Sequence, residues 1–510
     1  MSTAQIGMFV TMVVYLVAML GMGAAVSKKN KTVGDFYLGG RKLGPFVTAM
    51  SAEASDMSSY LLMGIPGLAY LSGIADAGWT IIGLATGTYI NWLVTAKRIR
   101  RYTETTGSIT VPAFFSDRYG DNKNVLTFIA AVIIVIFFVP YTASGFAGCG
   151  KLFASLFNSD YHIAMIASAI VIIGYTMLGG FLAASTTDFV QSIIMTAALI
   201  IILLFGTMKA GGPGAVYDNA KGLAGYFSML STHNPDTGDA SPYGFIRIVS
   251  TLAWGLGYFG MPHILLRFMA IEDDSKLKLS RRVATIWVLI SMAVSVCIGV
   301  VGLGMTAKGE IPVLHGSDSE TAIIRIADLL ASHGALCAVI AGIVLSGILA
   351  STMSTADSQL LCASSSISSD ILVKCFHVHI SEKKLMAISR LALVGIGIIG
   401  VLLAWNPNSS VFQIVSFAWA GFGATFGPVM ILALFWKRSN KYGALAGLIS
   451  GGIMIFVWKF AVRPLGGAFD IYELLPSFLV ALLFDVILSL ATKAPDKKVI
   501  ETYEKVDSMK

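Results

Sequence analysis

Long apolar windows recur along almost the whole chain, and they constrain its fold more than any other feature. A helix that crosses a bilayer needs about 20 mostly apolar residues. Thirteen windows of this kind lie at approximately 5–27, 45–72, 78–96, 125–156, 162–184, 189–208, 244–270, 283–305, 321–367, 386–404, 411–436, 442–461 and 471–491. The ninth is too long for one crossing, which predicts an extension or a break. We therefore expect an all-α integral membrane protein with about 13 transmembrane helices.

The scarcity of charged residues argues against a soluble protein. They make up 13% of the chain, whereas a soluble domain carries about a quarter. The net charge of +7 could suggest nucleic acid, but the basic residues gather between the apolar windows. No positive charge precedes the first window, so a cleavable signal peptide is not expected. The expected surroundings are a lipid bilayer, with no nucleic acid and no obligate protein partner.

The distribution of lysine and arginine predicts the orientation. Alternate connections are rich in them, namely 28–42 (with Lys28, Lys29 and Lys31), 97–101, 276–282, 374–384, 437–441 and the tail. The remaining connections hold few, namely Lys209, Lys221, Lys308 and Arg463. Basic residues favour cytoplasmic loops. This pattern predicts a multi-pass protein of the cell (inner or plasma) membrane, with the N-terminus outside and the C-terminus in the cytoplasm.

The second window contains the stretch SAEASDMSSYLLMG, residues 51–64, in which Glu53 and Asp56 lie among apolar neighbours. A charge at this depth costs roughly 2.5–3.5 kcal/mol on insertion scales and marks a functional site by default. The alternative is that Asp56 pairs with a basic residue in the bundle. Glu53 could face an aqueous vestibule or be protonated, and no role is assigned to it.

The seventh and ninth windows are also irregular. TLAWGLGYFGMPHILLRF, in the seventh, contains three glycines and Pro262, which predict an interrupted helix. GLGYFG matches a dinucleotide fingerprint, but no βαβ unit surrounds it. Trp254 and Tyr258 are four residues apart, so we expect them on one helix face, as ligand contacts or as ordinary packing. In SGILASTMSTADSQLL, four hydroxyl residues at 351, 354, 355 and 358 form a stripe that could bind an ion or join helices.

These features together suit a sodium ion. Hard cations prefer oxygen ligands, and broken helices free carbonyl oxygens at membrane depth. Windows two and seven stand five spans apart, as expected for inverted repeats. The predicted units are 1–44 (first helix and inner loop), 45–208 (first repeat), 209–243 (outer loop, a cover for an entrance or a mobile connection), 244–436 (second repeat), 437–491 (spans 12 and 13) and 492–510 (cytoplasmic tail).

The chain resembles the sodium/solute symporter family, and within it the sodium/proline symporters, nearly from end to end. The matching segments are DFYLGGRKLGPFVTAMSAEASDMSSYLLMGIPG, GLATGTYINWLVTAKRIRRYTE, GGFLAASTTDFVQ, LAWGLGYFGMPHILLRFMA, LASTMSTADSQLL and SFAWAGFGATFGPV. So many ordered matches are more specific than any single motif. The resemblance implies a LeuT-like fold of two inverted five-helix repeats, with broken helices at spans 2 and 7.

The resemblance also implies roles for individual residues. Sodium would be bound by the carbonyls of Ala54, Met57 and Ser351 and the hydroxyls of Ser354 and Thr355, with Asp56 needed for affinity. The substrate would contact Ser58, Tyr141, Trp254, Tyr258 and Pro262. Asp188, at the inner end of span five, would lie on the route of the ion to the cytoplasm. Arg41 would influence sodium coupling, although it could equally be a basic residue that reaches the membrane surface.

The implied function is a sodium-coupled secondary active symporter that imports a small zwitterionic amino acid, L-proline, by alternating access, with Na+ as the coupling ion and no enzymatic activity. Proline-type members read SAGASDMSGW where this chain reads SAEASDMSSY, so Glu53, Ser59 and Tyr60 weaken the case for proline and leave the sodium motif intact. The alternatives are a symporter for another small amino acid or organic solute, and a solute-gated channel or sensor. A membrane enzyme is disfavoured, because the histidines are scattered without a metal-binding motif.

Overall fold

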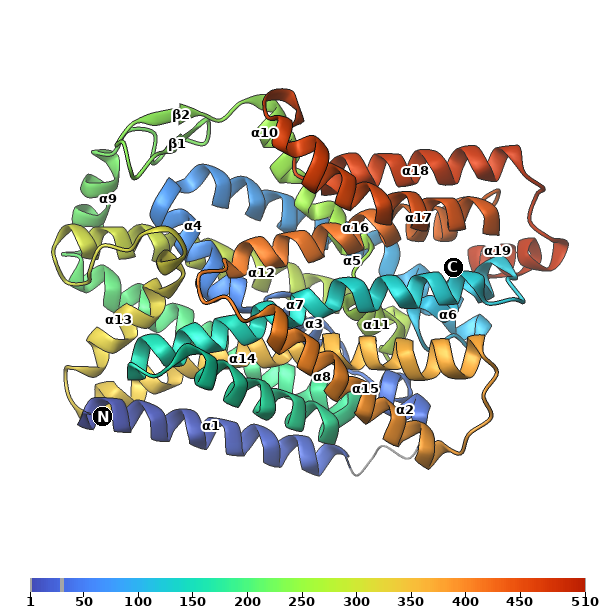
Figure 1. Cartoon of the computed structure of the whole chain (residues 1–510), viewed down its shortest axis with the longest axis horizontal. Helices are drawn as coiled ribbons and strands as arrows, with labels where there is room; N and C mark the ends of the chain where they lie inside the picture. Colours follow the sequence, from blue (N-terminus) through green and yellow to red (C-terminus); the bar gives the residue numbers. More distant parts are fainter. Residues whose placement is uncertain (1, 28–31, 510) are drawn as a thin grey trace.

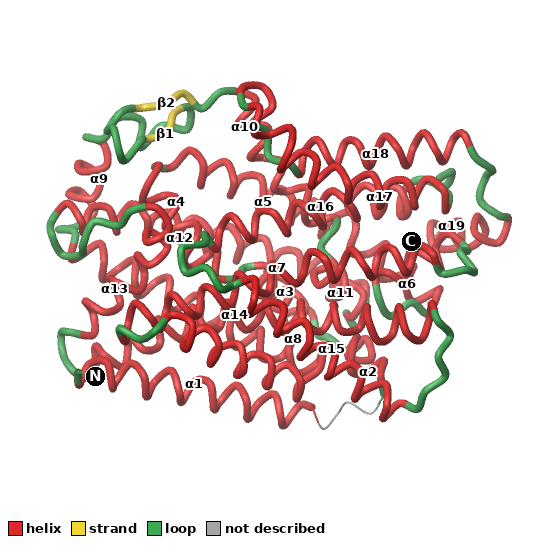
Figure 2. The backbone as a smooth tube through the Cα atoms, in the orientation of Figure 1, coloured by secondary structure: helices red, strands yellow, loops and turns green. Residues whose placement is uncertain are grey.

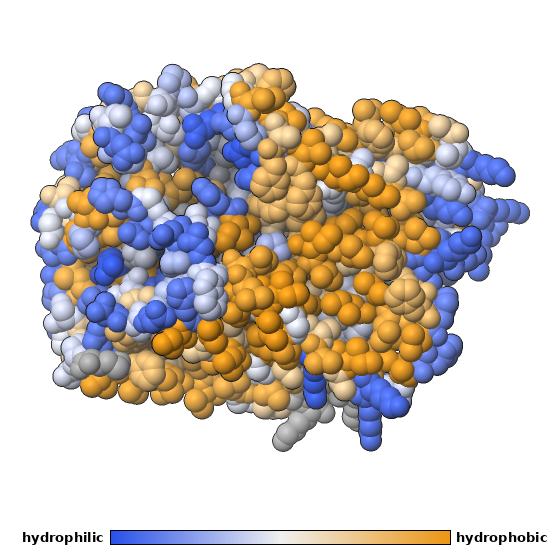
Figure 3. All heavy atoms as spheres, viewed as in Figure 1, coloured by the Kyte–Doolittle hydropathy of each residue, from blue (hydrophilic) through white to orange (hydrophobic). Residues whose placement is uncertain are grey.

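A computed structural model describes residues 2–27 and 32–509, so the basic cluster of Lys28, Lys29 and Lys31 lies outside the described residues. Helices dominate, and most of them run along the long axis of the molecule (Figures 1 and 2). The strands β1 (Ser231–His233) and β2 (Ala240–Pro242) mark one end, here called the hairpin end, and helix α19 (Lys497–Ser508) marks the other, the tail end. A hydrophobic belt covers much of the surface between more polar ends (Figure 3), as a bilayer requires.

All thirteen apolar windows coincide with helical segments. In chain order these are α1 (Thr3–Ser27), α3 (Pro45–Asp56) with α4 (Ile65–Ser72), α5 (Ile74–Thr106), α7 (Val125–Phe157), α8 (Tyr161–Lys209), α10 (Phe245–Leu252) with α11 (Pro262–Ala270), α12 (Leu277–Ala307), α13 (Ala322–Ala331) with α14 (Ala335–Ser365), α15 (Glu382–Leu403), α16 (Val411–Phe435), α17 (Lys441–Val457) and α18 (Leu474–Ala491). Short helices α2 (Val33–Leu38), α6 (Val111–Tyr119) and α9 (Pro213–Lys221) lie in the connections.

Among the described residues, nine helices are long and apolar enough to span a membrane unaided. The difference from thirteen has structural causes. Windows two and seven are divided, polar residues interrupt the apolar stretch of α5, and α8 covers two windows. The ninth window breaks between α13 and α14, as its length predicts.

Helix α8 is in fact two arms that meet at Gly180. This residue has φ 64° and ψ −178°, outside the helical region and accessible mainly to glycine. The hydroxyls of Tyr175 and Thr187 are hydrogen-bonded, although 12 residues separate them. In a straight helix that separation would be about 18 Å. The chain therefore reverses at Gly180, which keeps windows five and six as separate segments.

The 209–243 connection is docked on the bundle and is not a free loop. It contains α9 and the β1–β2 hairpin. The hydroxyl of Tyr226 donates to the carbonyl of Ala69 at the end of α4, and the N–H of Ile74 donates to the carbonyl of Tyr226. The connection thus fixes the junction of α4 and α5 at the hairpin end.

The tail is also structured. Helix α19 buries Val499, Tyr503 and Val506 against the bundle, and Arg98 of α5 forms an ion pair with Asp507. Inside the bundle, α14 packs against α1, α7 and α8, and α3 packs against α8, α11, α12 and α14. The two divided windows and α14 therefore meet in the centre.

Candidate functional site

Helix α3 ends in the middle of the bundle because its hydrogen bonds change register at Asp56. The N–H of Met57 still donates to the carbonyl of Glu53, but the N–H of Ser58 donates to the carbonyl of Asp56 at 2.8 Å. Met57 has φ −75° and ψ 69°, which is not helical. The chain resumes as a π-helical turn, Tyr60–Gly64, before α4. The carbonyl of Ala54 consequently has no partner within its own helix.

Helix α14 places its hydroxyl stripe against this break. The Ser354 hydroxyl donates to the carbonyl of Ala54 at 2.8 Å, and the hydroxyls of Ser354 and Thr355 also approach the carbonyl of Ser351, at 3.3 and 3.1 Å. Met57 is fully buried one residue beyond Asp56. Four of the residues predicted to bind sodium therefore lie where α3 and α14 meet, namely Ala54, Ser351, Ser354 and Thr355, and Asp56 and Met57 follow at the end of α3.

Asp56 pairs with a tyrosine. Its Oδ2 accepts a hydrogen bond from the Tyr258 hydroxyl at 2.6 Å, and its backbone carbonyl accepts one from the Tyr141 hydroxyl at 3.5 Å. Asp56 is completely buried, and its Oδ1 has no hydrogen-bond partner within the described part of the chain. No basic side chain within those residues forms an ion pair with it. The pairing alternative is therefore wrong for Asp56.

Glu53 faces helix α5. Its Oε1 accepts hydrogen bonds from the Trp92 indole N–H at 2.8 Å and from the Thr88 hydroxyl at 3.0 Å. The side chain is 1% exposed. The suggestion that Glu53 faces an aqueous vestibule is therefore wrong. Thr88 and Trp92 are four apart on one helix, a spacing that could have signalled a shared polar partner.

The second interruption is a 3-10 helix, Ala253–Phe259, followed by Gly260 and by α11, which starts at Pro262. A Cβ at Gly257 would collide with the indole of Trp419, and one at Gly260 with the carbonyl of Phe422. Glycine is needed at both positions because α16 approaches so closely.

The prediction that Trp254 and Tyr258 share a face is wrong, because this segment has three residues per turn. The Tyr258 hydroxyl reaches Asp56, whereas Trp254 lines a cavity of about 630 Å³ near the hairpin end. Trp419 lies between them, with its indole N–H donating to the carbonyl of Trp254 at 2.8 Å and its ring centroid 5.0 Å from that of Tyr258.

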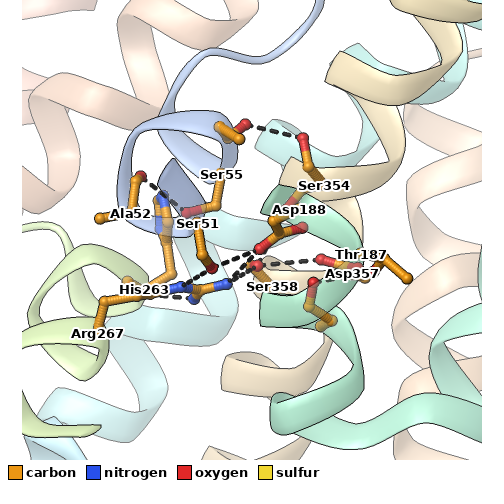
Figure 4. A network of polar contacts seen from close by, with 12 residues as sticks. Ser51, Ala52, Ser55, Thr187, Asp188, His263, Arg267, Ser354, Asp357 and Ser358 are labelled. Carbon is orange, nitrogen blue, oxygen red and sulfur yellow. Dashed lines mark hydrogen bonds and ion pairs between the residues drawn. The ribbon is translucent and has the colours of Figure 1, made fainter. Parts of the chain in front are cut away.

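A buried ion pair lies toward the tail end of the break (Figure 4). Arg267 of α11 is 3.1 Å from Oδ2 of Asp188, and both side chains are 1% exposed or less. Arg267 also donates to Ser51 of α3 at 3.0 Å and to Ser358 of α14 at 2.6 Å, and Ser51 donates to Asp188 at 2.7 Å. Asp188 belongs to the second arm of α8, which forms span six, so its predicted place at the inner end of span five is wrong. Sequence reasoning placed Asp188 near the ion's route but missed Arg267.

Arg41 does not simply reach the membrane surface. Its guanidinium donates to the carbonyls of Met269 at 2.6 Å, Thr103 at 3.0 Å and Ser108 at 2.8 Å. These contacts join the end of α11 to the end of α5 and the loop after it. Arg41 therefore holds together the tail-end termini of two helices, which the sequence did not predict.

Comparison with known proteins decides the family. The model of the sodium:solute symporter family matches residues 36–451, which is most of the chain. The chain belongs to the sodium:solute symporter family. Membership makes it a multi-pass membrane protein, and it supports sodium as the coupling ion.

Relatives in the family align along almost the full length. The osmoregulated proline transporter OpuE of Bacillus subtilis (strain 168) is 40% identical over 97% of this chain and 96% of its own length. The high-affinity proline transporter PutP of the same organism is 40% identical over 95% and 98%. A sodium/proline symporter of Staphylococcus aureus is 38% identical over 96% and 93%.

Two solved structures share the fold. One is a Na+-coupled sialic acid symporter in a substrate-bound outward-open state, with a TM-score of 0.79 at 17% identity, covering 96% of this chain and 99% of that one. The other is Mhp1, a nucleobase-cation-symport-1 family transporter in a closed conformation, with a TM-score of 0.57 at 12% identity, covering 94% and 99%. The predicted LeuT-like fold, with its broken helices, is confirmed.

Proposed function

We propose that this protein imports L-proline together with Na+ by alternating access. The observation that carries the proposal is the contact of the Ser354 hydroxyl with the carbonyl of Ala54, which brings a hydroxyl stripe to a broken helix in the buried centre of the bundle. The names of three relatives at 38–40% identity support proline as the solute.

Sodium would bind between α3 and α14. The ligands are the carbonyls of Ala54, Met57 and Ser351 together with the hydroxyls of Ser354 and Thr355. A hydroxyl has both a proton and lone pairs. The Ser354 hydroxyl can therefore donate a hydrogen bond to the carbonyl of Ala54, or coordinate a sodium ion through its oxygen. Asp56 supplies negative charge next to these ligands, and its unpaired Oδ1 supports a role in attracting a cation.

Proline would bind beside the ion, between the two interruptions. Ser58 lies at the start of the freed segment of window two, and Pro262 starts α11, whose N-terminal N–H groups favour a carboxylate. Tyr141 and Tyr258 both bond to Asp56 and so couple this region to the sodium ligands. Trp254, with Tyr141, would pack on the pyrrolidine ring. Each ligand should then favour binding of the other, since coupling between sites is reciprocal.

The departures from the proline-type sequence do not argue strongly for another solute. Glu53 turns away from the break toward α5. The hydroxyl of Tyr60 contacts the sulfur of Met57, and Ser59 packs near Gly148 of α7. A different small amino acid remains the second candidate, because Ser59 and Tyr60 lie next to Ser58. Transport rather than catalysis is the proposed activity in either case.

The orientation and the ion's exit are part of the proposal. The hairpin end would face outward and the tail end the cytoplasm, since the tail-end connections carry most of the basic residues. Sodium would leave past Asp188 once the contacts of Arg267 had opened. Arg41, by joining α11 to α5, would affect how ion and substrate movements are coupled.

The test is uptake of a panel of labelled amino acids by vesicles reconstituted with the protein, with and without an inward sodium gradient. Thr355→Ala removes one ligand, and contacts to charged groups are worth roughly 1.5–3 kcal/mol. The sodium concentration for half-maximal uptake should therefore rise about 10- to 150-fold. Thr355→Ser, which keeps the hydroxyl, is the matched control. Equal uptake with and without the sodium gradient would refute the symport proposal. An unchanged sodium dependence of uptake in Thr355→Ala would refute the proposed sodium site.

A further inference from the structure

His263 is a histidine in the first turn of α11. Its side chain is completely buried. Neither Nδ1 nor Nε2 of its imidazole has a hydrogen-bond partner within residues 2–27 and 32–509. Buried polar groups in folded proteins are nearly always hydrogen-bonded, so an unpaired one needs an explanation. The fold makes no use of the polarity of this ring, which indicates a partner from outside the chain.

The imidazole of His263 lies in the region where the two interrupted segments meet. It points from α11 toward α3 (Figure 4) and lies beside the backbone of Ser55, one residue before Asp56. Its centroid is 5.5 Å from that of Phe138 on α7. Phe138 and Tyr141 are three residues apart and so share a face of α7, and the Tyr141 hydroxyl donates to the carbonyl of Asp56. His263 is therefore next to residues proposed to contact the amino acid.

The free group of the imidazole is an acceptor. A neutral imidazole has one N–H donor and one nitrogen with a lone pair. We expect the neutral form, because an imidazolium would be buried close to the guanidinium of Arg267, which donates to the carbonyl of His263 at 3.0 Å. The carbonyl of Ser55 can only accept, so it can take the N–H of the ring but not pair with the other nitrogen. The lone pair of that nitrogen would bind most strongly to a charged N–H group.

The backbone around His263 offers donors. Pro262 has no N–H, and the first N–H of α11 with an acceptor is that of Leu265, which donates to the carbonyl of Met261 at 3.1 Å. In the part of the chain that the structure describes, the N–H groups of His263 and Ile264 have no backbone acceptor, and no side chain caps the helix. Free N–H groups at a helix N-terminus favour a carboxylate.

These two features match the two charges of an amino acid. The carboxylate and the ammonium of an α-amino acid are carried by the same carbon atom, so their partners in a site must also lie close together. The backbone N–H groups at 263–264 and the imidazole of His263 meet this condition, because they belong to one helical turn. A ligand with a carboxylate alone would leave the imidazole unpaired.

We propose that His263 is a substrate-binding residue, whose imidazole accepts a hydrogen bond from the ammonium group of the amino acid while the start of α11 binds its carboxylate. The inference rests on the proposed function and adds to it a residue that selects for an amino group. A solute of the same shape without an N–H group would leave the imidazole unpaired and would bind more weakly.

Competition with an oxygen analogue of proline tests this inference. In (S)-tetrahydrofuran-2-carboxylate an ether oxygen replaces the ammonium group, so the ring and the carboxylate are kept and the N–H groups are lost. Each compound is used to inhibit sodium-driven uptake of labelled proline. A hydrogen bond to a charged group corresponds to about 10- to 150-fold in affinity. His263→Leu should therefore lower the ratio of the analogue to the proline inhibition constant by about 10- to 150-fold, through weaker binding of proline.

Two variants serve as controls. His263→Gln keeps an acceptor oxygen and should retain most of the ratio. Phe138→Leu alters the packing on the imidazole without changing a polar group, so it should change both inhibition constants by the same factor. His263→Met is a second apolar variant, to be used if His263→Leu is poorly folded, and it should lower the ratio as well.

An unchanged ratio in the apolar variants, or an equal rise of both inhibition constants, would overturn the inference. Replacing an unpaired buried imidazole with an apolar side chain should not lower the denaturant concentration at which the protein unfolds. Loss of the folded state in both apolar variants would show that the fold itself needs the ring, and would also overturn the inference. Absence of sodium-driven proline uptake by the unaltered protein would instead overturn the proposed function.

Discussion

Variants of the ion pair between Arg267 and Asp188 can distinguish a contribution to stability from a contribution to transport. Both groups are buried, and the pair joins α11 to the second arm of α8. Arg267→Met removes one charge and leaves Asp188 with Ser51 alone. Asp188→Leu removes the other and leaves the Arg267 guanidinium with the hydroxyls of Ser51 and Ser358 but without the carboxylate of its ion pair. The double variant Arg267→Met with Asp188→Leu removes both charges and puts two apolar side chains in their place.

The expected magnitude follows from the distance. At 3.1 Å and an effective dielectric of about 20, the attraction is about 5 kcal/mol. Breaking a buried pair by removing one partner costs about 3–5 kcal/mol, whereas replacing both with apolar residues is often neutral. Each single variant should therefore lose about 3–5 kcal/mol of unfolding free energy. The double variant should lie within roughly 1–2 kcal/mol of the unaltered protein, because the hydroxyls of Ser51 and Ser358 lose a partner.

The assay is equilibrium unfolding in detergent micelles, followed by circular dichroism, together with sodium-driven uptake by vesicles. We expect the double variant to be stable but to transport poorly, because the Arg267 network joins α3 and α11 to α8 and α14, and the proposed release of sodium past Asp188 depends on the opening of these contacts. Two results would refute this reasoning. One is single variants as stable as the unaltered protein. The other is a double variant whose loss equals the sum of the two single losses.

Two other contacts give direct tests. Glu53→Ala leaves the Trp92 indole and the Thr88 hydroxyl without an acceptor, and each lost hydrogen bond should lower the unfolding free energy by about 1–3 kcal/mol. This variant should therefore unfold at a lower denaturant concentration than Glu53→Gln, which keeps the acceptor, and equal unfolding midpoints would count against the observed contacts. Arg41→Lys replaces a guanidinium that donates hydrogen bonds to three carbonyls with a single ammonium, so the unfolding free energy should fall by about 1–3 kcal/mol. An unchanged unfolding free energy would mean that the contacts of Arg41 with α11 and α5 do not stabilise the protein.

The sequence predicted the helices and the interruptions well, because both depend on local patterns. Apolar length predicts a crossing, and polar residues or glycine at membrane depth predict a break. The sequence predicted two crossings here but placed the gap between them at 185–188, whereas the chain reverses at Gly180, since GG alone does not reveal a positive φ. The 3-10 geometry of 253–259 was missed, and with it the different surroundings of Trp254 and Tyr258.

The contacts between distant segments could not be predicted from local patterns. Arg267 sits in an apolar run and is 79 residues from Asp188 in sequence, so nothing nearby indicated its partner. Lys151 and Glu320 form another ion pair of low exposure, at 2.8 Å, which was missed for the same reason. Such pairs depend on which helix faces meet, and that is decided by packing across the whole bundle.

The hydrogen bond from Ser354 to the carbonyl of Ala54 has a consequence for the step of a transport cycle in which the protein changes conformation without ion or substrate. A pocket lined only by carbonyl oxygens would leave several acceptors unpaired in a dry interior once its cargo had gone, and each would raise the free energy of the unloaded carrier. At the proposed sodium site a hydroxyl would avoid this, because it can donate its proton to a carbonyl oxygen or offer its lone pairs to an ion. A side chain that can only accept would slow recovery of the unloaded protein without weakening its hold on the ion.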